Sequence, residues 1–423
     1  MTTLSPPFET RVTCRSCGGG DLAEIIAFGD TPIADRLVPL GHGDPQFTAP
    51  LTLVRCRSCT MCQIKETVAP KVLFPADYPY YSSVSPALIA HFRESAMDLM
   101  RSGVARPGMR VIEAASNDGY LLETFLQNGL EVLGVDPADG PVSVARSKGI
   151  ETVCDFFGHG LAKEIRETKG AADVFLANNV LAHVADTNDF VAGIAEILSD
   201  EGIAVIECPY LIDMVQNCAF DTIYHQHLLF LSLTSLNPLF ERHGLYVNDV
   251  LRLKIHGGSL RLFISRNNDA TERCRALLAS EAILGLNEEG FFDEFVARID
   301  HMKVSLCETI KRLKSSGKRI AGYGAAAKAT TLMHHFGFET GDIEFIVDKS
   351  PWKHGMEMPV TGIPIVGVER LQADRPDVLV ILAWNFANEI ISENRAFIEA
   401  GGTFLVPVPE LREVAADFAG VSL

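Results

Sequence analysis

Residues 110–125 read RVIEAASNDGYLLETF: an apolar run that ends on Glu113, a turn of small and polar residues up to Gly119, and a leucine-rich stretch. The apolar run predicts a buried strand, and the stretch from Tyr120 predicts a helix. A strand, a tight turn and a helix start form the unit from which open α/β sheets are built. The fold should therefore be α/β.

Further strands are expected beyond this unit. Apolar runs with helical stretches between them recur at 131–135, 174–177 and 202–207. Such alternation predicts a parallel sheet with crossover helices, and we place this central domain at residues 81–268. A charged, helical stretch follows, and a second alternating region begins at Arg319. We assign residues 269–423 to a helical connector and a C-terminal Rossmann-like domain.

Polar residues follow the expected strands at the intervals of a nucleoside-binding sheet. Asp136 ends the second strand, where it suits two ribose hydroxyls, and Asp155 with Phe156 closes a third, where they could meet an adenine. This order favours a class I methyltransferase that binds S-adenosylmethionine (SAM) over a nucleotide-free or dinucleotide-binding sheet. The expected cofactor residues are Glu113, Ala115, Asn117, Asp118, Gly119, Asp136, Asp155, Phe156 and Asn178. Ala115 stands where such turns generally have glycine, so the backbone must tolerate a Cβ there.

Cysteines are concentrated near the start of the chain. Cys14-x-x-Cys17 and Cys56-x-x-Cys59 have the spacing of a four-thiolate zinc site, because two intervening residues form a knuckle that aims both sulfurs at one ion. Four thiolates leave no coordination position for water, so the Zn²⁺ should be structural and stabilise a small domain at residues 1–80. We expect Cys62 to be a buried or free thiol.

Residues 221–232 read DTIYHQHLLFLS and place two histidines and a tyrosine in an apolar setting. Burial lowers the pKa of an imidazole and keeps it neutral enough to accept a proton. C-methylation needs such a base, because a carbon attacks a sulfonium methyl only after deprotonation, and a tyrosine hydroxyl suits the resulting enolate oxygen. A structural role is the competing interpretation for each histidine, and also for His183, which follows the strand at 174–177.

Two other segments suggest substrate contacts. Residues 319–328 read RIAGYGAAAK, in which Gly322, Tyr323, Gly324 and Lys328 suit the pyrophosphate of a nucleotide sugar. An NAD site is the alternative, because Asp348 lies about 20 positions on, although Ala327 occupies the place of a third glycine. Residues 78–83 read YPYYSS, and here Tyr80 and Ser82 are substrate candidates, with interdomain packing as the alternative.

The bulk properties exclude several classes of protein. A net charge of −17 repels nucleic acid, and no apolar run is long enough to span a bilayer. The first residues lack the pattern of a signal peptide. We therefore expect a cytoplasmic protein, a monomer, whose partner is a small molecule.

These segments together resemble the sugar C-methyltransferases that modify deoxysugars of antibiotics, the family of the tetronitrose, mycarose and noviose enzymes. The motifs that carry the resemblance are the two cysteine pairs, YPY at 78–80, residues 113–119, IYHQH at 223–227, HGG at 256–258, residues 322–328 and AWN at 383–385. The resemblance implies a zinc-binding N-terminal domain, a central methyltransferase domain and a C-terminal domain that helps bind the nucleotide sugar, to which Trp384 and Asn385 would belong.

The resemblance also implies a thymidine-diphosphate 4-keto-2,6-dideoxy sugar as acceptor, methylated at C3. Tyr78, Tyr224, His183 and His227 would line the sugar, and His227 would remove the C3 proton. The family member compared has glutamate before the last histidine, whereas this chain has Gln226, which cannot take a proton. Gln226 would then only orient the substrate, with His227 as the base. The competing hypotheses are a non-catalytic nucleotide-sugar binder and a zinc-ribbon methyltransferase acting on another substrate.

Overall fold

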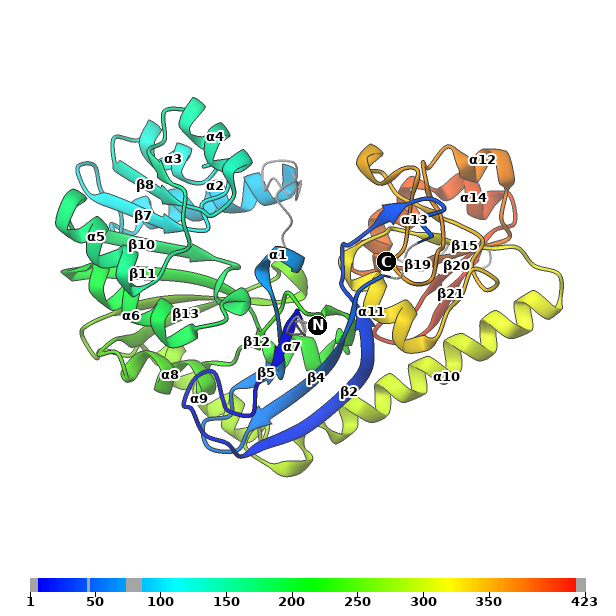
Figure 1. Ribbon diagram of the computed structural model, residues 1–423, viewed down its shortest axis with the longest axis horizontal. Coiled ribbons are helices and arrows are strands. Elements are labelled where there is room, and N and C mark those ends of the chain that lie inside the picture. Colours follow the sequence, from blue (N-terminus) through cyan, green and yellow to red (C-terminus); the bar gives the residue numbers. More distant parts are fainter. Residues whose placement is uncertain (1–6, 44–45, 74–85, 416–423) are drawn as a thin grey trace, which may run out of the picture.

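The computed structural model describes residues 7–43, 46–73 and 86–415, which form three units (Figure 1). Two α/β units lie on opposite sides of the molecule, and long N-terminal strands run beneath both. The predicted α/β class with three parts is confirmed. The predicted boundaries at residues 80 and 268 stay predictions.

The N-terminal unit is an antiparallel sheet in the order β12-β5-β4-β2. Its own strands are β2 (Leu22–Pro32), β4 (Thr48–Cys56) and β5 (Cys62–Ile64). The edge strand β12 (Leu229–Phe230) comes from the central part of the chain. A second small sheet pairs β1 (Phe8–Thr10) with β6 (Glu66–Val68), and the short helix α1 (Pro70–Leu73) follows.

The central unit is a seven-stranded sheet in the order β13-β14-β11-β10-β7-β8-β9. Its strands are β7 (Arg110–Ala114), β8 (Glu131–Val135), β9 (Thr152–Val153), β10 (Ala172–Asn178), β11 (Leu198–Pro209), β13 (Tyr246–Leu253) and β14 (Ser259–Ser265). Only β14 runs antiparallel to its neighbours. The strands predicted at 110–113, 131–135, 174–177 and 202–207 all lie in this sheet.

Helices cover both faces of the central sheet. They are α2 (Pro86–Arg101), α3 (Leu122–Gln127), α4 (Asp139–Ser147), α5 (His159–Lys169), α6 (Thr187–Ile197) and α8 (Leu233–Glu241). Helix α7 (Leu211–Gln216) follows β11 and contacts residues 220–222. Phe92 and Phe125, from α2 and α3, pack on one face beside Val111. Ile165 and Ile194, from α5 and α6, belong to the larger core of the other face. Burial on both faces explains why these strands read as continuous apolar runs.

The C-terminal unit is a six-stranded sheet in the order β18-β16-β15-β19-β20-β21, parallel except for β21. Its strands are β15 (Ile320–Tyr323), β16 (Ile346–Val347), β18 (Ile365–Val366), β19 (Val378–Ile381), β20 (Thr403–Val406) and β21 (Arg412–Val414). Its helices are α11 (Ala327–Phe336), α12 (Arg370–Asp374), α13 (Ala387–Glu393) and α14 (Arg395–Glu399). The strand order reverses between β15 and β19, which is where open α/β sheets bind ligands.

The three units interlock. Helices α9 (Glu272–Ile283) and α10 (Asp293–Ser315) connect the two α/β units, and α10 runs along the base of the C-terminal unit (Figure 1). Strand β3 (Val38–Pro39) pairs with β17 (Met356–Glu357), so the N-terminal part contacts the C-terminal unit directly. Helix α11 also packs against β2. Within the described residues, no helix is long and apolar enough to cross a bilayer.

Candidate functional site

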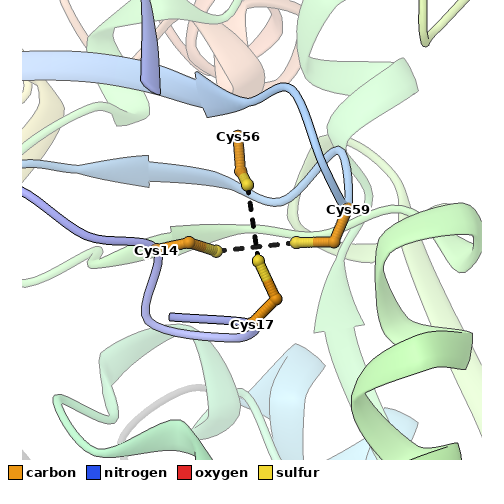
Figure 2. Close-up of side chains that lie close together, drawn as sticks. All are labelled: Cys14, Cys17, Cys56 and Cys59. Atoms are coloured by element: carbon orange, nitrogen blue, oxygen red, sulfur yellow. Dashed lines mark hydrogen bonds between the residues drawn. The ribbon is translucent and has the colours of Figure 1, made fainter. Parts of the chain in front are cut away.

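The four cysteines predicted to bind zinc converge in one cluster (Figure 2). Their sulfurs all lie within 4.8 Å of one another, and the Cys14–Cys59 and Cys17–Cys56 Sγ pairs are each 3.5 Å apart. Zn–S bonds of about 2.3 Å in a tetrahedron separate the sulfurs by roughly 3.8 Å, so this donor set fits Zn²⁺. Cys62 is buried and its thiol lies 3.7 Å from the Thr60 carbonyl, outside the cluster.

Each cysteine knuckle closes on a residue with positive φ. Gly18 (φ 75°) and Thr60 (φ 62°) donate their backbone N–H groups to the carbonyls of Cys14 and Cys56. The first knuckle is bound to the central unit, because Asn188 Nδ2 donates to the carbonyls of Arg15 (2.8 Å) and Ser16 (2.9 Å). The four-cysteine site therefore stabilises the interface between the N-terminal and central units as well as its own sheet.

The turn after β7 has the strained backbone of a ligand cradle. Ala115 and Asn117 have φ of 57° and 49°, in the left-handed region that costs a residue with a Cβ about 1–2 kcal/mol. Asp136, at the end of β8, accepts from the backbone N–H groups of Asn117 and Ala138, both at 2.9 Å. The predicted ribose carboxylate thus also fixes the shape of the turn.

Glu113 ends up buried at the floor of this turn, with 1% of its surface exposed. One carboxyl oxygen accepts from Asn178 Nδ2 at 3.5 Å, and the other has no partner among the described residues. Burial raises the pKa of Glu113 to about 8. Asp118 is also buried and contacts Lys148 Nζ at 3.2 Å. A buried, incompletely satisfied acid suits a polar or cationic ligand group.

Asp155 and Phe156 lie at the exposed edge of this region. Asp155 accepts from the backbone N–H of Phe156, whose ring is 64% exposed. The next residue, Phe157, turns inward and packs on Phe175 and Phe190. The predicted contact of Asp155 and Phe156 with an adenine stays a prediction.

His227 and Tyr224 form a hydrogen-bonded pair, with Tyr224 Oη 2.9 Å from His227 Nε2. The other ring nitrogen of His227, Nδ1, lies 2.7 Å from the Thr222 carbonyl, an acceptor that requires this nitrogen to carry the hydrogen. Nε2 is therefore the unprotonated nitrogen, and it accepts from the tyrosine hydroxyl. Burial, followed by the charges of neighbouring groups, lowers the pKa of His227 to about 3, so the ring is neutral.

His183 lies beside this pair, with 5.0 Å between its ring centroid and that of His227. Its Nδ1 faces the Gln226 carbonyl at 2.7 Å, and burial lowers its pKa. His225 points away and donates to the carbonyls of Ala49 (3.2 Å) and Pro50 (3.0 Å) on β4. The structure therefore brings His183, Tyr224 and His227 together and gives His225 a packing role.

The side chain of Gln226 points to the N-terminal unit. Its Nε2 donates to the Ala34 carbonyl at 2.8 Å, and its Oε1 has no partner among the described residues. A glutamate could make this contact only in its protonated form. The sequence alone does not reveal that the amide is used in this way.

Gly322, within β15, and Gly324, just after it, are needed for packing. A Cβ on Gly322 would lie 2.8 Å from Ile346, and one on Gly324 (φ 92°) would lie 2.5 Å from Ala383 Cβ. Tyr323 is 4% exposed and packs in the core of the C-terminal unit. The backbone N–H of Ala325 donates to Asp348 at 2.8 Å, so this acid holds the turn.

Lys328, Trp384 and Asn385 do lie together, between β15 and β19. Lys328 Nζ donates to Asn385 Oδ1 at 2.6 Å and sits 4.4 Å from the centre of the Trp384 ring. Trp384 Nε1 in turn donates to Asp221 Oδ2 at 2.6 Å, across the interface with the central unit. Sequence reasoning did not single out Asp221, whose only signal was an acidic residue at the start of an apolar segment. Tyr78, Tyr80 and Ser82 lie outside the described residues.

Comparison with known proteins gives matches to all three units. A zinc binding domain model matches residues 14–74, a methyltransferase domain model matches 89–250, and a C-methyltransferase C-terminal domain model matches 254–409.

Individual relatives match this chain over different lengths. The chain is 36% identical over 412 residues to the C-methyltransferase NovU of Streptomyces niveus, covering 96% of this chain and 97% of that protein. It is 32% identical over 126 residues to a ubiquinone biosynthesis O-methyltransferase of Azorhizobium caulinodans, covering 29% of this chain and 47% of that protein. Among solved structures, a magnesium protoporphyrin IX methyltransferase from Synechocystis has a TM-score of 0.33 and 14% identity over 42% of this chain and 79% of its own.

Proposed function

The chain belongs to the C-methyltransferase family, and from this premise we propose that it methylates C3 of a 4-keto-deoxysugar linked to a nucleoside diphosphate. The observation that carries the proposal is the neutral His227, whose Nδ1–H is held by the Thr222 carbonyl while Nε2 faces a tyrosine hydroxyl. When bound, SAM supplies an electrophilic methyl group on a sulfonium. The buried carboxyl groups of Glu113 and Asp136 and the strained turn at 115–119 are the residues that would hold it.

Proton removal falls to His227 Nε2 in this proposal. A hydrogen on C3 is acidic because it is adjacent to the C4 ketone. The pKa of about 3 describes the pocket without substrate, in which burial opposes the imidazolium. An enolate that forms next to the ring provides the opposite charge and raises that pKa again, so the proton can move from C3 to Nε2.

Tyr224 has a second part in the same step. Its hydroxyl is bonded to Nε2 in the protein alone, so that contact must open before Nε2 can reach the C3 hydrogen. The Tyr224 O–H would then donate to the C4 oxygen, where negative charge develops. As the C3–methyl bond forms, the bond between the methyl group and the sulfonium sulfur would break and leave a neutral thioether. The C4 carbonyl is then restored, and the imidazolium returns its proton to solvent.

The C-terminal unit supports a diphosphate-linked substrate. Lys328 lies in the first turn of α11, at the point where the strand order reverses, and its ammonium is held by Asn385 over the ring of Trp384. A cation at a helix N-terminus suits a phosphate group. The contact from Trp384 to Asp221 places this region beside the segment that carries Tyr224 and His227, so one substrate could span both.

The test uses thymidine-diphosphate 4-keto-2,6-dideoxy sugars and SAM with a labelled methyl group. Wild-type protein should transfer the label to C3 and should also exchange the C3 hydrogen with D₂O in the absence of SAM. His227→Asn should lose both reactions by at least about 100-fold and keep SAM affinity within about twofold, whereas the control His301→Asn, an exposed residue of α10, should change neither. Full activity of His227→Asn would exclude that residue as the base, and binding without label transfer across the panel would indicate a non-catalytic binder.

A further inference from the structure

Residues 221–223 are held by the C-terminal unit on two sides. Trp384 Nε1 donates to the Asp221 carboxylate at 2.6 Å, and the hydroxyl of Thr331, on α11, donates to the Ile223 carbonyl at 3.0 Å. These contacts join residues of the central unit to a turn and a helix of the C-terminal unit. The position of this short segment therefore depends on how the two units dock.

The residue between these two contacts is the one that orients His227. The Thr222 carbonyl accepts from His227 Nδ1 at 2.7 Å, and this bond determines which ring nitrogen carries the hydrogen. If Asp221 moved, the carbonyl next to it would move too. The ring could then take the other tautomer, with the hydrogen on Nε2 and no lone pair facing the substrate.

Asp221 is a buried acid that connects the central unit to the C-terminal unit. Its residue is 0% exposed, Oδ2 takes the indole hydrogen, and Oδ1 has no partner among the described residues. Lys328, from the C-terminal unit, lies over the face of the same indole ring, 4.4 Å from its centre. Burial raises the pKa of Asp221 to about 6, and Lys328 opposes that rise. A buried acid with a single hydrogen bond is costly to keep, which points to a role beyond packing.

We propose that Asp221 and Trp384 are positioning residues through which the docked C-terminal unit sets the tautomer of His227 and so permits proton removal. This inference rests on the proposed function, in which His227 is the base and the C-terminal unit binds the nucleotide sugar. Its consequence is that the base is competent only when the substrate-binding unit is seated against Asp221.

The experiment compares three variants with a matched control. Trp384→Phe keeps an aromatic ring under Lys328 and removes the N–H donor, Asp221→Leu removes the acceptor, and Asp221→Asn keeps one oxygen acceptor. The control, Arg312→Gln, breaks an exposed salt bridge to Glu413 elsewhere in the C-terminal unit. Three quantities are measured: the ¹⁵N chemical shifts of the His227 ring in the protein alone, C3–H exchange in D₂O without SAM, and kcat and KM for methyl transfer.

Trp384→Phe and Asp221→Leu should lose the Nδ1–H signature of His227 and slow both C3 exchange and kcat by about 10- to 100-fold, the range for one charge-assisted hydrogen bond. KM and SAM affinity should stay within about twofold, and Asp221→Asn should recover most of the rate. The control should match wild type.

A Trp384→Phe protein that keeps the wild-type tautomer and exchange rate would overturn the proposal. So would a variant in which only KM rises, because Trp384 would then be a simple substrate contact. If Asp221→Leu fails to fold, Trp384→Phe and Asp221→Asn still decide the question. If wild-type protein exchanges no C3 hydrogen, the proposed function fails, yet the ring-nitrogen shifts, recorded without substrate, still test the coupling.

Discussion

Replacing Gln226 with glutamate tests whether this position acts on the substrate or holds two units together. The Gln226 amide is 5% exposed and donates to the Ala34 carbonyl at 2.8 Å. An ionised glutamate at position 226 would place a carboxylate oxygen against the Ala34 carbonyl oxygen and would leave that carbonyl without a hydrogen-bond donor. We therefore expect Gln226→Glu to destabilise the protein and to leave turnover no higher than in wild type.

The magnitude follows from burial and from the lost bond. An unsatisfied buried acceptor costs about 1–3 kcal/mol, and a carboxyl whose pKa is raised by two units costs about 2.7 kcal/mol at high pH. The two costs together predict a loss of about 4–6 kcal/mol at pH 8. Because the folded-state pKa of the new carboxyl would be raised, the loss should be small near pH 4, where it is protonated and can donate to Ala34. The loss should grow as pH rises through the folded-state pKa.

Denaturant unfolding from pH 5 to 8, together with methyl-transfer rates, checks this expectation. Gln372→Glu, at an exposed position of α12, is the matched control and should unfold like wild type throughout. A Gln226→Glu protein that is as stable as wild type at pH 8 and turns over faster would refute the reasoning, because the side chain would then have to face the substrate.

Three other outcomes are expected. A chelator should remove about one zinc ion per chain and lower the melting temperature, and saturating substrate should not slow this removal. Purified protein that lacks stoichiometric zinc would contradict this prediction. Gly119→Ala should lower the free energy of unfolding by about 2–3 kcal/mol and weaken SAM binding, because residue 119 has a φ of 74° and its new Cβ would lie 2.5 Å from Ile150. The control Ala115→Gly should stay within about 1 kcal/mol of wild type in unfolding experiments. Since burial lowers the pKa of His227 to about 3, the unfolded chain takes up a proton there first as pH falls below 6.5, and stability is lost toward pH 3. His227→Asn should therefore show a shallower fall, by about 1.4 kcal/mol per pH unit, between pH 6 and 4; an unchanged slope would count against the burial of a neutral ring.

The parts of the fold that local sequence encodes were predictable. The two cysteine pairs predict the four-cysteine zinc site because the geometry of each knuckle depends on four consecutive residues. Residues 110–125 give the strand, turn and helix start because apolar periodicity and a glycine mark each boundary. The charged, helical stretch predicted before residue 319 likewise corresponds to α10, whose buried residues Phe295, Ile299, Met302 and Leu306 lie three or four positions apart.

Long-range contacts were not predictable from one sequence. Asp221 and Trp384 are 163 positions apart, and Gln226 and Ala34 are 192 apart. No local pattern specifies such pairs, since they depend on how separately folded units dock. Gly322 and Gly324 show the same limit, because the sequence does not reveal that a Cβ there would meet Ile346 and Ala383.

The pairing of β3 with β17 constrains the order in which the protein matures on the ribosome. The backbone N–H of Gly41 bonds to the Glu357 side chain, 316 positions later in the chain. At a synthesis rate of about 5–20 residues per second, roughly 15–60 s pass between the synthesis of β3 and that of its partner strand β17. Until Glu357 has been made, Val38 and Gly41 lack these partners, so the N-terminal and C-terminal units can dock only late in synthesis.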